Sequence, residues 1–302
     1  MKVINYAVPL EGRNASVRLY ALGDVHLGAA NCAERELIRL IDLIAADENA
    51  YWIGGGDCTD AIILNDTKRF DVNTLPNWML VGNPRTIKSR IGDILFAQRE
   101  RFVDLTRKIH SKCIGMIEGN HEYSIFKYHN HDHMSMLCDQ IGADNLTDCA
   151  FIRMQFRRKS KTEDATLSTR SVTIFICHGH GGGRTAGAEP NKLARLASDK
   201  DVDILLTGHS HTFNILPPIP TLYIPMRGVV PTDPCVREKH VGNWGAFLYC
   251  YKEGPSTYDS RANYPVRPMY TIQTEIQPFA KRANAAGEVI EQVRINMNAI
   301  KL

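Results

Sequence analysis

Five short apolar runs in this chain end in residues whose side chains can bind metal ions. A short apolar run bounded by turn residues is typical of a buried β-strand. Stretches with helical spacing lie between several of these runs, and this alternation with glycine at the strand exits is typical of α/β proteins. We therefore expect an α/β fold whose polar strand ends form one site. The five ends are Asp24-Val25-His26, Gly54-Gly55-Gly56-Asp57, Gly119-Asn120-His121-Glu122, His178-Gly179-His180 and Gly208-His209-Ser210-His211.

Apolar residues at helical spacing predict helices before the second and third of these ends. The first helix is expected to begin at Asn31, which is a favourable N-cap with Glu34 three residues later. The second is expected as one long helix from Ser89 to about Lys112. The C-terminal residues 280–302 carry valines and isoleucines in a pattern that fits either a helix or a strand.

The character of the chain changes after residue 212, where proline recurs among short β-type runs. A second sheet packed on the first fits this pattern better than a separate domain, because no long linker intervenes. We therefore expect one domain over residues 1–302. Its motif-bearing core would span about residues 17–212, and residues 213–302 would form a β-rich part of the same domain.

Composition narrows the class of protein. The hydrophobic content of 44% and charged content of 23% are ordinary globular values, and a net charge of +3 gives no warrant for a surface-wide nucleic-acid or membrane footprint. The eight cysteines are scattered without a Cys-x-x-Cys pair, which favours reduced core thiols over a disulfide framework. No signal peptide is visible, and no apolar run approaches the ~20 residues of a membrane helix. The expected location is cytoplasmic, without a membrane partner.

The strand ends carry the residue types of a metal site. Asp24 and His26 are two residues apart, so on an extended backbone their side chains share a side, and His209 and His211 repeat that spacing. Asp57 follows three glycines, where backbone can approach an ion closely, and its carboxylate can bridge two cations. Imidazole and carboxylate ligands suit manganese, iron or zinc, and the lack of thiolates argues against a structural zinc site.

Two divalent metals can bind a phosphoryl group together and acidify a water molecule for attack on phosphorus. The leaving oxygen then needs an acid, and His121 beside Asn120 is the candidate. A single histidine or aspartate at a strand end is more often an ordinary polar residue than a ligand. Five such ends in one chain make coincidence improbable.

Two further polar segments have open interpretations. A histidine-rich passage is expected to be a solvated or lid-like loop, with substrate contact as the alternative; it is His129-Asn130-His131-Asp132-His133. A basic stretch is expected to be a solvated hairpin tip, with attraction of an anionic substrate as the alternative; it contains Arg157, Arg158, Lys159 and Lys161.

The complete pattern resembles the calcineurin-like metallophosphoesterase superfamily over about residues 17–212. The matching motifs are Asp24/His26, Gly56-Asp57-Cys58-Thr59-Asp60, Gly119-Asn120-His121-Glu122, His178 and Gly208-His209-Ser210-His211. The resemblance implies a four-layered α/β sandwich, in which two mixed β-sheets face each other and helices flank them.

The resemblance also implies roles for individual residues. One metal would be held by Asp24, His26, Asp57 and His211. The other would be held by Asp57, Asn120, His178 and His209, with Asp57 bridging the two. His121 would be the catalytic acid and Asp60 its partner. Either His178 or His180 could be the ligand in its segment, and His178 is preferred because it directly follows the strand. His180 and Arg184 are the candidates for substrate binding.

Two positions separate this chain from the phosphoprotein phosphatase branch, which carries arginines where this sequence has Ala61 and Glu118. The branch of lipid-A-precursor pyrophosphatases has arginine where His121 stands. The sequence is more similar to phosphodiesterases and DNA-repair-type nucleases. We therefore expect a metal-dependent phosphodiesterase or nuclease, in which a metal-bridging hydroxide attacks phosphorus and His121 is the general acid.

The expected cofactors are two divalent metal ions, manganese first, with iron, zinc, nickel and magnesium as alternatives. The expected partner is a phosphoester, including nucleotides and nucleic acids. Two alternatives remain open. One is a phosphomonoesterase for a small metabolite or nucleotide, and the other is a non-catalytic binding scaffold on the same fold.

Overall fold

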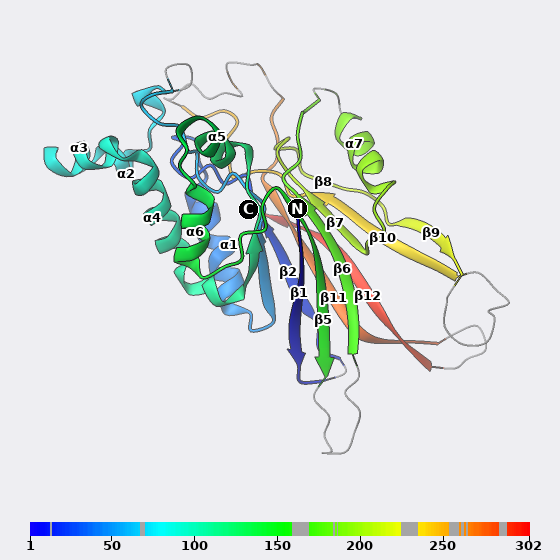
Figure 1. The fold of residues 1–302 in the computed structure, drawn as a ribbon. Coiled ribbons are helices and arrows are strands. Elements are labelled where there is room, and N and C mark those ends of the chain that lie inside the picture. The colour runs from blue at the N-terminus through cyan, green and yellow to red at the C-terminus, as the bar shows by residue number, and fades with distance from the viewer. Residues whose placement is uncertain are drawn as a thin grey trace.

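The computed structural model describes most of the chain and shows two β-sheets with helices around them (Figure 1). The described residues are 1–12, 14–66, 70–158, 169–183, 185, 187–224, 235–253, 260, 263, 265–283 and 289–302. Seven α-helices lie within this part of the chain. Among the described residues, no helix has the length and apolar character needed to cross a bilayer.

The first sheet has seven strands and is mixed. Its strand order is β1-β5-β6-β7-β10-β8, and β9 pairs with β10. The pairs β1–β5, β6–β7 and β7–β10 are parallel, whereas β5–β6, β10–β8 and β10–β9 are antiparallel. The strands are β1 (Lys2–Leu10), β5 (Cys149–Arg158), β6 (Thr169–Cys177), β7 (Ile204–Thr207), β8 (Asn214–Ile215), β9 (Ile219–Tyr223) and β10 (Cys235–Asn243).

The second sheet has five strands in the order β12-β11-β2-β3-β4 and is also mixed. Its strands β2, β3 and β4 are parallel to one another. Strand β11 is antiparallel to β2, and β12 is antiparallel to β11. The strands are β2 (Val17–Leu22), β3 (Ala50–Gly54), β4 (Cys113–Met116), β11 (Tyr270–Ala283) and β12 (Val289–Lys301).

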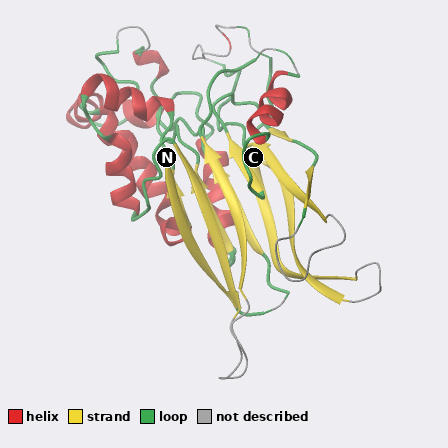
Figure 2. Ribbon diagram, turned by 45° about the vertical axis from the view of Figure 1, so that its right-hand side comes forward, coloured by secondary structure: helices red, strands yellow, loops and turns green. Residues whose placement is uncertain are grey.

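Helices flank the strands on both sides (Figure 2). Most of them gather beside the second sheet, and the first sheet is covered by one helix after β6 (Figure 1). The helices are α1 (Glu34–Ala46), α2 (Asn77–Leu80), α3 (Pro84–Gly92), α4 (Ile94–Thr106), α5 (Asn120–His129), α6 (His133–Ile141) and α7 (Ala188–Ala197), with short 3-10 helices at Val72–Thr74 and Arg107–Lys112.

Three apolar clusters hold these layers together. The largest lies between the sheets and joins residues such as Ile152 and Ile174 of the first sheet to Leu19 and Ile276 of the second. A second cluster packs α1, α4 and α6 on the outer face of β2 and β3, and a third packs α7 on β6, β7 and β10. Each large side chain buried in this way contributes about 1.5–3 kcal/mol. The four-layered sandwich predicted from the sequence is confirmed.

Two local predictions need correction, and one open alternative is resolved. The first helix begins at Glu34 and not at Asn31, whose side-chain amide instead donates to the backbone carbonyl of Tyr249 at 3.0 Å. The expected long helix after Ser89 is two helices, because Asp93 ends α3 and its carboxylate caps the start of α4. The described residues of the C-terminal stretch, which fitted either state, are strand: residues 280–283 end β11 (Tyr270–Ala283), and β12 spans Val289–Lys301.

The chain beyond residue 212 is hydrogen-bonded into both sheets. Strand β10 pairs with β7 in the first sheet, and β11 pairs with β2 in the second. These pairings place the β-rich C-terminal part against the strands that carry the ligand-type residues. The assignment of residues 1–302 to one domain stays a prediction.

Candidate metal centre

The five polar strand ends lie at one edge of the two sheets. Asp24, Asp57 and Asn120 follow the parallel strands β2, β3 and β4, so all three lie at the carboxyl ends of that set. His178 and His209 follow the parallel strands β6 and β7 of the facing sheet. Because the sheets pack face to face, these ends meet above the apolar core.

One group of possible ligand atoms comprises Asp24, His26 and His211. The Nε2 atoms of His26 and His211 are 3.1 Å apart, and Asp24 Oδ1 lies 3.4 Å from His211 Nε2 and 4.0 Å from His26 Nε2. Asp24 and His26 are buried, and His211 is half-buried. Two imidazole nitrogens and a carboxylate oxygen therefore converge on one point.

A second group comprises Asp57, His178 and His209. Asp57 Oδ2 lies 3.2 Å from His178 Nε2. The side-chain oxygen of Asn120 lies 3.1 Å from His178 Nε2 and 2.6 Å from His209 Nδ1. The Nδ1–H of His178 donates to the backbone carbonyl of Gly55 at 2.8 Å, which turns Nε2 toward the group. This hydrogen bond fixes the ring as a metal site requires.

Asp57 lies between the two groups. Its Oδ2 atom is 3.7 Å from His26 Nε2 in the first group as well as 3.2 Å from His178 Nε2 in the second. A third set of close ligand atoms joins His26, Asp57 and His121. A carboxylate in this place can contact cations on either side of it.

The backbone at these ligand positions is strained. Asp24, His26, Asp57, His209 and His211 all have φ between 48° and 69°, in the left-handed region. Such a conformation is uncommon for residues other than glycine, and it clusters at functional sites where the surrounding structure enforces it. The sheets therefore hold these five residues in a conformation that the local sequence does not favour.

The residues fit divalent cations. Asp24 Oδ1 is fully buried and has no hydrogen-bond partner, although a buried carboxylate oxygen normally has one. The donor atoms are imidazole nitrogens and carboxylate and amide oxygens, a set that suits manganese, iron and zinc. The Cys58 thiol does not belong to the set, because it packs in the outer core and burial raises its pKa well above the usual range.

The protonation of the histidines reflects the surrounding carboxylates. Burial alone would lower the pKa of His178, but the carboxylates of Asp57 and Asp24 outweigh burial and raise it to about 10. Burial and the neighbouring His178 lower the pKa of His209 to about 4. A cation held by Asp57 and Asp24 would compete with the proton on His178, so metal binding would release protons.

His121 belongs to the third set of ligand atoms, with His26 and Asp57, and its ring is oriented by the backbone of Asp60. Its Nδ1–H donates to the backbone carbonyl of Asp60 at 2.5 Å, and its backbone amide donates to Asp57 Oδ1 at 2.9 Å. Burial opposes protonation of the ring, yet the Asp57 and Asp60 carboxylates raise the pKa of His121. The Asp60 carboxylate lies 3.9 Å from His121 Nδ1 and 3.7 Å from His26 Nδ1. Asp60 thus contacts the histidines and not the centre of the site.

The structure separates the two histidines of the fourth strand end. His178 is buried within the second group, whereas His180 is exposed and belongs to none of the three groups. Arg184, the other candidate for substrate binding, lies outside the described residues.

The histidine-rich passage is not a solvated loop throughout. His129 is exposed at the end of α5, but His133 begins α6 and is fully buried. The ring of His133 bonds to the Thr59 hydroxyl at 3.0 Å, so it supports the loop behind Asp57. The tip of the basic stretch, residues 159–168, lies outside the described part of the chain.

Two polar side chains that support the site had no role in the sequence analysis. Trp244 donates from Nε1 to Asp24 Oδ2 at 2.6 Å. Asn243, fully buried, donates to the backbone carbonyl of Gly208 at 3.2 Å and to the Ser210 hydroxyl at 3.0 Å. The contacts of Trp244 and Asn243 arise because β10 pairs with β7. A sequence pattern of short β-type runs does not reveal that pairing.

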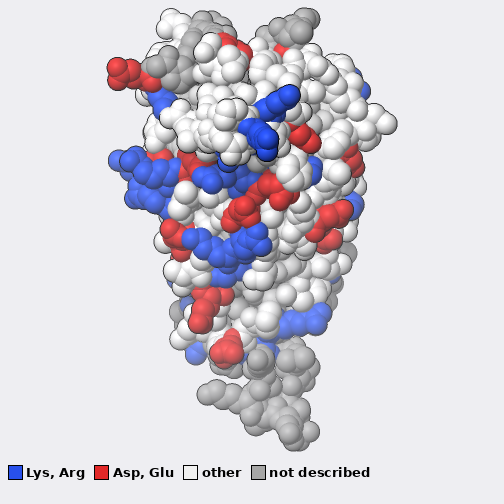
Figure 3. All heavy atoms as spheres, turned by 90° about the vertical axis from the view of Figure 1, so that its left-hand side faces the viewer, with Lys and Arg blue, Asp and Glu red and all other residues white. Residues whose placement is uncertain are grey.

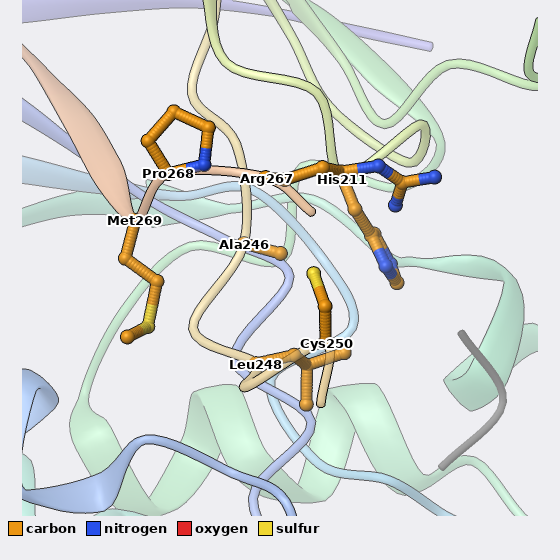
Figure 4. Close-up of a pocket in the computed structure, with 7 residues that line it drawn as sticks. All are labelled: His211, Ala246, Leu248, Cys250, Arg267, Pro268 and Met269. Atoms are coloured by element: carbon orange, nitrogen blue, oxygen red, sulfur yellow. The ribbon is translucent and has the colours of Figure 1, made fainter. Parts of the chain in front are cut away.

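A small pocket adjoins the first group. It is lined by His211, Ala246, Leu248, Cys250, Arg267, Pro268 and Met269. Figure 4 shows the guanidinium group of Arg267 and the ring of His211 extending to the same side of this pocket. The C-terminal part of the chain therefore places a cationic side chain beside a candidate metal ligand.

The chain belongs to the calcineurin-like phosphoesterases, because the model of that family matches residues 17–213. No curated protein matches the sequence. Among solved structures, a conserved uncharacterized protein of Streptococcus pneumoniae TIGR4, described as a predicted phosphoesterase, is 11% identical with a TM-score of 0.32, covering 94% of this chain and 99% of its own. A Vps29 double mutant from Entamoeba histolytica is 12% identical with a TM-score of 0.35, covering 94% and 100%.

Proposed function

We propose that this protein is a phosphodiesterase that binds two divalent metal ions. Manganese is the metal expected at both positions. The observation that carries the proposal is the position of Asp57, whose Oδ2 atom lies within 3.7 Å of His26 in one group and 3.2 Å of His178 in the other. Asp24, His26 and His211 would complete the first site, and Asn120, His178 and His209 the second. When bound, two such ions neutralise phosphoryl oxygens and acidify a water molecule.

The chain's own residues would orient the substrate and move the protons. His121 directs Nδ1–H to the Asp60 carbonyl, which leaves Nε2 to give a proton to the departing oxygen. In the metal-free site the Asp57 and Asp60 carboxylates raise the pKa of His121, which favours a proton on the ring. A positioned general acid of this kind typically contributes 10²–10⁴-fold in rate.

The charges around the site favour a diester over a monoester. A phosphodiester carries one negative charge and a monoester carries up to two, so a monoesterase benefits from several cations. This chain has Ala61 and Glu118 where the phosphoprotein phosphatase branch has arginines. Arg267 lines the pocket beside His211 and would contact one phosphoryl oxygen.

One face of the molecule gives less support to a long nucleic acid as substrate. On the face that carries α2 and α3, basic and acidic side chains are interspersed (Figure 3). A protein that follows a nucleic-acid backbone normally presents a continuous basic stripe. We therefore expect a small diester or a short nucleotide to be hydrolysed faster than duplex DNA.

Metal analysis combined with two model substrates tests this proposal. Protein reconstituted with Mn²⁺ should contain about two equivalents and hydrolyse bis-p-nitrophenyl phosphate faster than p-nitrophenyl phosphate. The Asp57→Asn variant, purified in parallel, gives the background rate. Faster turnover of the monoester would replace the proposal with a phosphomonoesterase. Absence of both metal and turnover after reconstitution would leave a binding scaffold.

A further inference from the structure

We propose that Trp244 is a positioning residue for the metal ligand Asp24. The indole N–H would hold one carboxylate oxygen so that the other is directed at the first metal. The inference rests on the proposed function, because it assumes that Asp24 is a ligand. It goes beyond the family's matched region, since Trp244 lies after residue 213, where that match ends.

The two oxygens of Asp24 have different surroundings. Oδ2 accepts hydrogen bonds from Trp244 Nε1 at 2.6 Å and from the backbone amide of His209 at 2.9 Å. Oδ1 has no hydrogen-bond partner and lies 3.4 Å from His211 Nε2. Both Asp24 and Trp244 are almost completely buried, so water does not replace either bond. The two donors therefore fix the carboxylate rotation and leave Oδ1 for an ion.

Three glycines of the strand ends make room for the indole. A Cβ atom added at Gly23, Gly55 or Gly208 would lie closer than 3.0 Å to the ring of Trp244. The indole thus packs against the backbone of β2, β3 and β7 at the points where the ligand-bearing loops begin. Its own backbone amide donates to the carbonyl of Thr207 at 3.1 Å, which anchors it next to β7. These contacts pack the ring closely against the backbone with Nε1 directed at Asp24.

Packing and hydrogen bonding by Trp244 can be separated by substitution. Trp244→Phe keeps an aromatic ring against the glycines but removes the N–H donor. Loss of a residue that orients a metal ligand typically weakens metal binding 10–100-fold. Trp52 supplies a matched control, since it is also fully buried and donates from Nε1 to the Ile109 carbonyl at 2.8 Å, away from the site.

The test is calorimetric titration of metal-free protein with MnCl₂, together with thermal unfolding of the metal-free proteins. The wild type should bind about two equivalents, and Trp244→Phe should retain one site while the other weakens 10–100-fold. Trp52→Phe should bind both ions as the wild type does. Wild-type affinity at both sites of Trp244→Phe overturns the inference, as does equal weakening by Trp52→Phe. Failure of the wild type to bind Mn²⁺ instead overturns the proposed function, and the inference with it.

A second measurement needs no variant of Trp244. The ¹⁵N–¹H spectrum of the wild type contains three indole N–H signals, because the chain has three tryptophans. Zn²⁺, a diamagnetic probe, should shift the Trp244 signal and leave that of Trp52 in place, with Trp52→Phe and Trp78→Phe identifying the other two signals. If Zn²⁺ binds and the Trp244 signal does not move, Trp244 does not sense the metal and the inference fails.

Discussion

The carboxylate of Glu122 accepts a hydrogen bond of 2.9 Å from the backbone amide of Asp57, a residue 65 positions earlier in the chain. The same side chain accepts from the backbone amides of Thr59 and Gly119, each at 3.2 Å. Glu122 is fully buried. It therefore ties the loop after β3 to the start of α5 and fixes the two strand ends that carry Asp57 and Asn120.

Replacing this carboxylate should destabilise the protein. In Glu122→Gln one terminal oxygen becomes an NH₂ donor, which faces a backbone N–H and leaves it unsatisfied. We expect the free energy of unfolding to fall by about 1–3 kcal/mol. Urea unfolding of the metal-free protein measures this change. Glu253→Gln, at an exposed position, is the control and should have wild-type stability.

Asp57 and His211 should affect metal content differently. Because Asp57 lies between both groups, Asp57→Asn should weaken the binding of both Mn²⁺ ions. His211 belongs to the first group only, so His211→Asn should leave the second site. Equilibrium dialysis followed by elemental analysis gives the stoichiometry. Asp203→Asn, which removes a half-buried carboxylate bonded to the Thr173 amide, controls for the loss of a hydrogen-bonded charge away from the site. Retention of both ions by Asp57→Asn would contradict the bridging role.

His121 should be needed for turnover and not for metal. We expect His121→Asn to contain as much Mn²⁺ as the wild type and to lose roughly 10²–10⁴-fold in kcat. The loss should be smaller for a diester with a leaving group that needs no proton, since the acid then contributes less. His129→Asn, at the exposed end of the same helix, should retain wild-type activity. Metal loss in His121→Asn would reassign this residue as a ligand.

His178 and His180 offer a matched pair of substitutions two residues apart. His178→Asn should lose one Mn²⁺ equivalent, because its Nε2 atom lies 3.2 Å from Asp57 Oδ2. His180→Asn should bind both ions, since this side chain is exposed. A rise in KM without metal loss would give His180 a role in substrate binding. The opposite pattern of metal loss would exchange the two assignments.

His133 should make the fold sensitive to acid. Burial lowers the pKa of His133 to about 3, with Arg99 adding to the effect, whereas a histidine in the unfolded chain has a pKa near 6.5. Between these values the unfolded state binds a proton that the folded state does not. Stability should therefore fall as the pH decreases from about 6.5 towards 3, by roughly 1 kcal/mol per pH unit from this residue.

The variant His133→Gln should show a flatter decrease of unfolding free energy with acid than the wild type. Urea unfolding of the metal-free proteins at pH 7, 6 and 5 measures the two slopes. The exposed His129→Gln should keep the wild-type slope. Equal slopes for wild type and His133→Gln would mean that the ring is protonated within the folded protein.

The grouping of the ligand-type residues at one edge could be predicted because each follows an apolar strand within a few residues. A strand end fixes direction, so Asp24 and His209 needed no knowledge of their distant neighbours to be placed at the same edge. The fold class followed from the same alternation of strands and helices. The extended backbone expected for the pairs Asp24/His26 and His209/His211 was wrong. These residues and Asp57 have left-handed φ values, which local preference does not favour.

Other features depend on tertiary contacts that no local pattern records. The pattern around Ser89 is helical on both sides of Asp93, and only the cap made by that carboxylate divides the helix. His133 lies in a polar passage, yet packing of α6 buries it completely. Trp244 reaches Asp24 because β10 pairs with β7, and the distance between them in sequence hid this contact.

The pairings of β10 with β7 and of β11 with β2 also govern aggregation. A protein shortened near residue 213 would keep every candidate ligand but would leave β7 and β2 as edge strands. Both strands are almost entirely apolar and buried, and such unprotected edges template pairing with other chains. The C-terminal strands β10 and β11 thus protect the edges of β7 and β2, and a shortened protein should form insoluble aggregates rather than a smaller soluble protein.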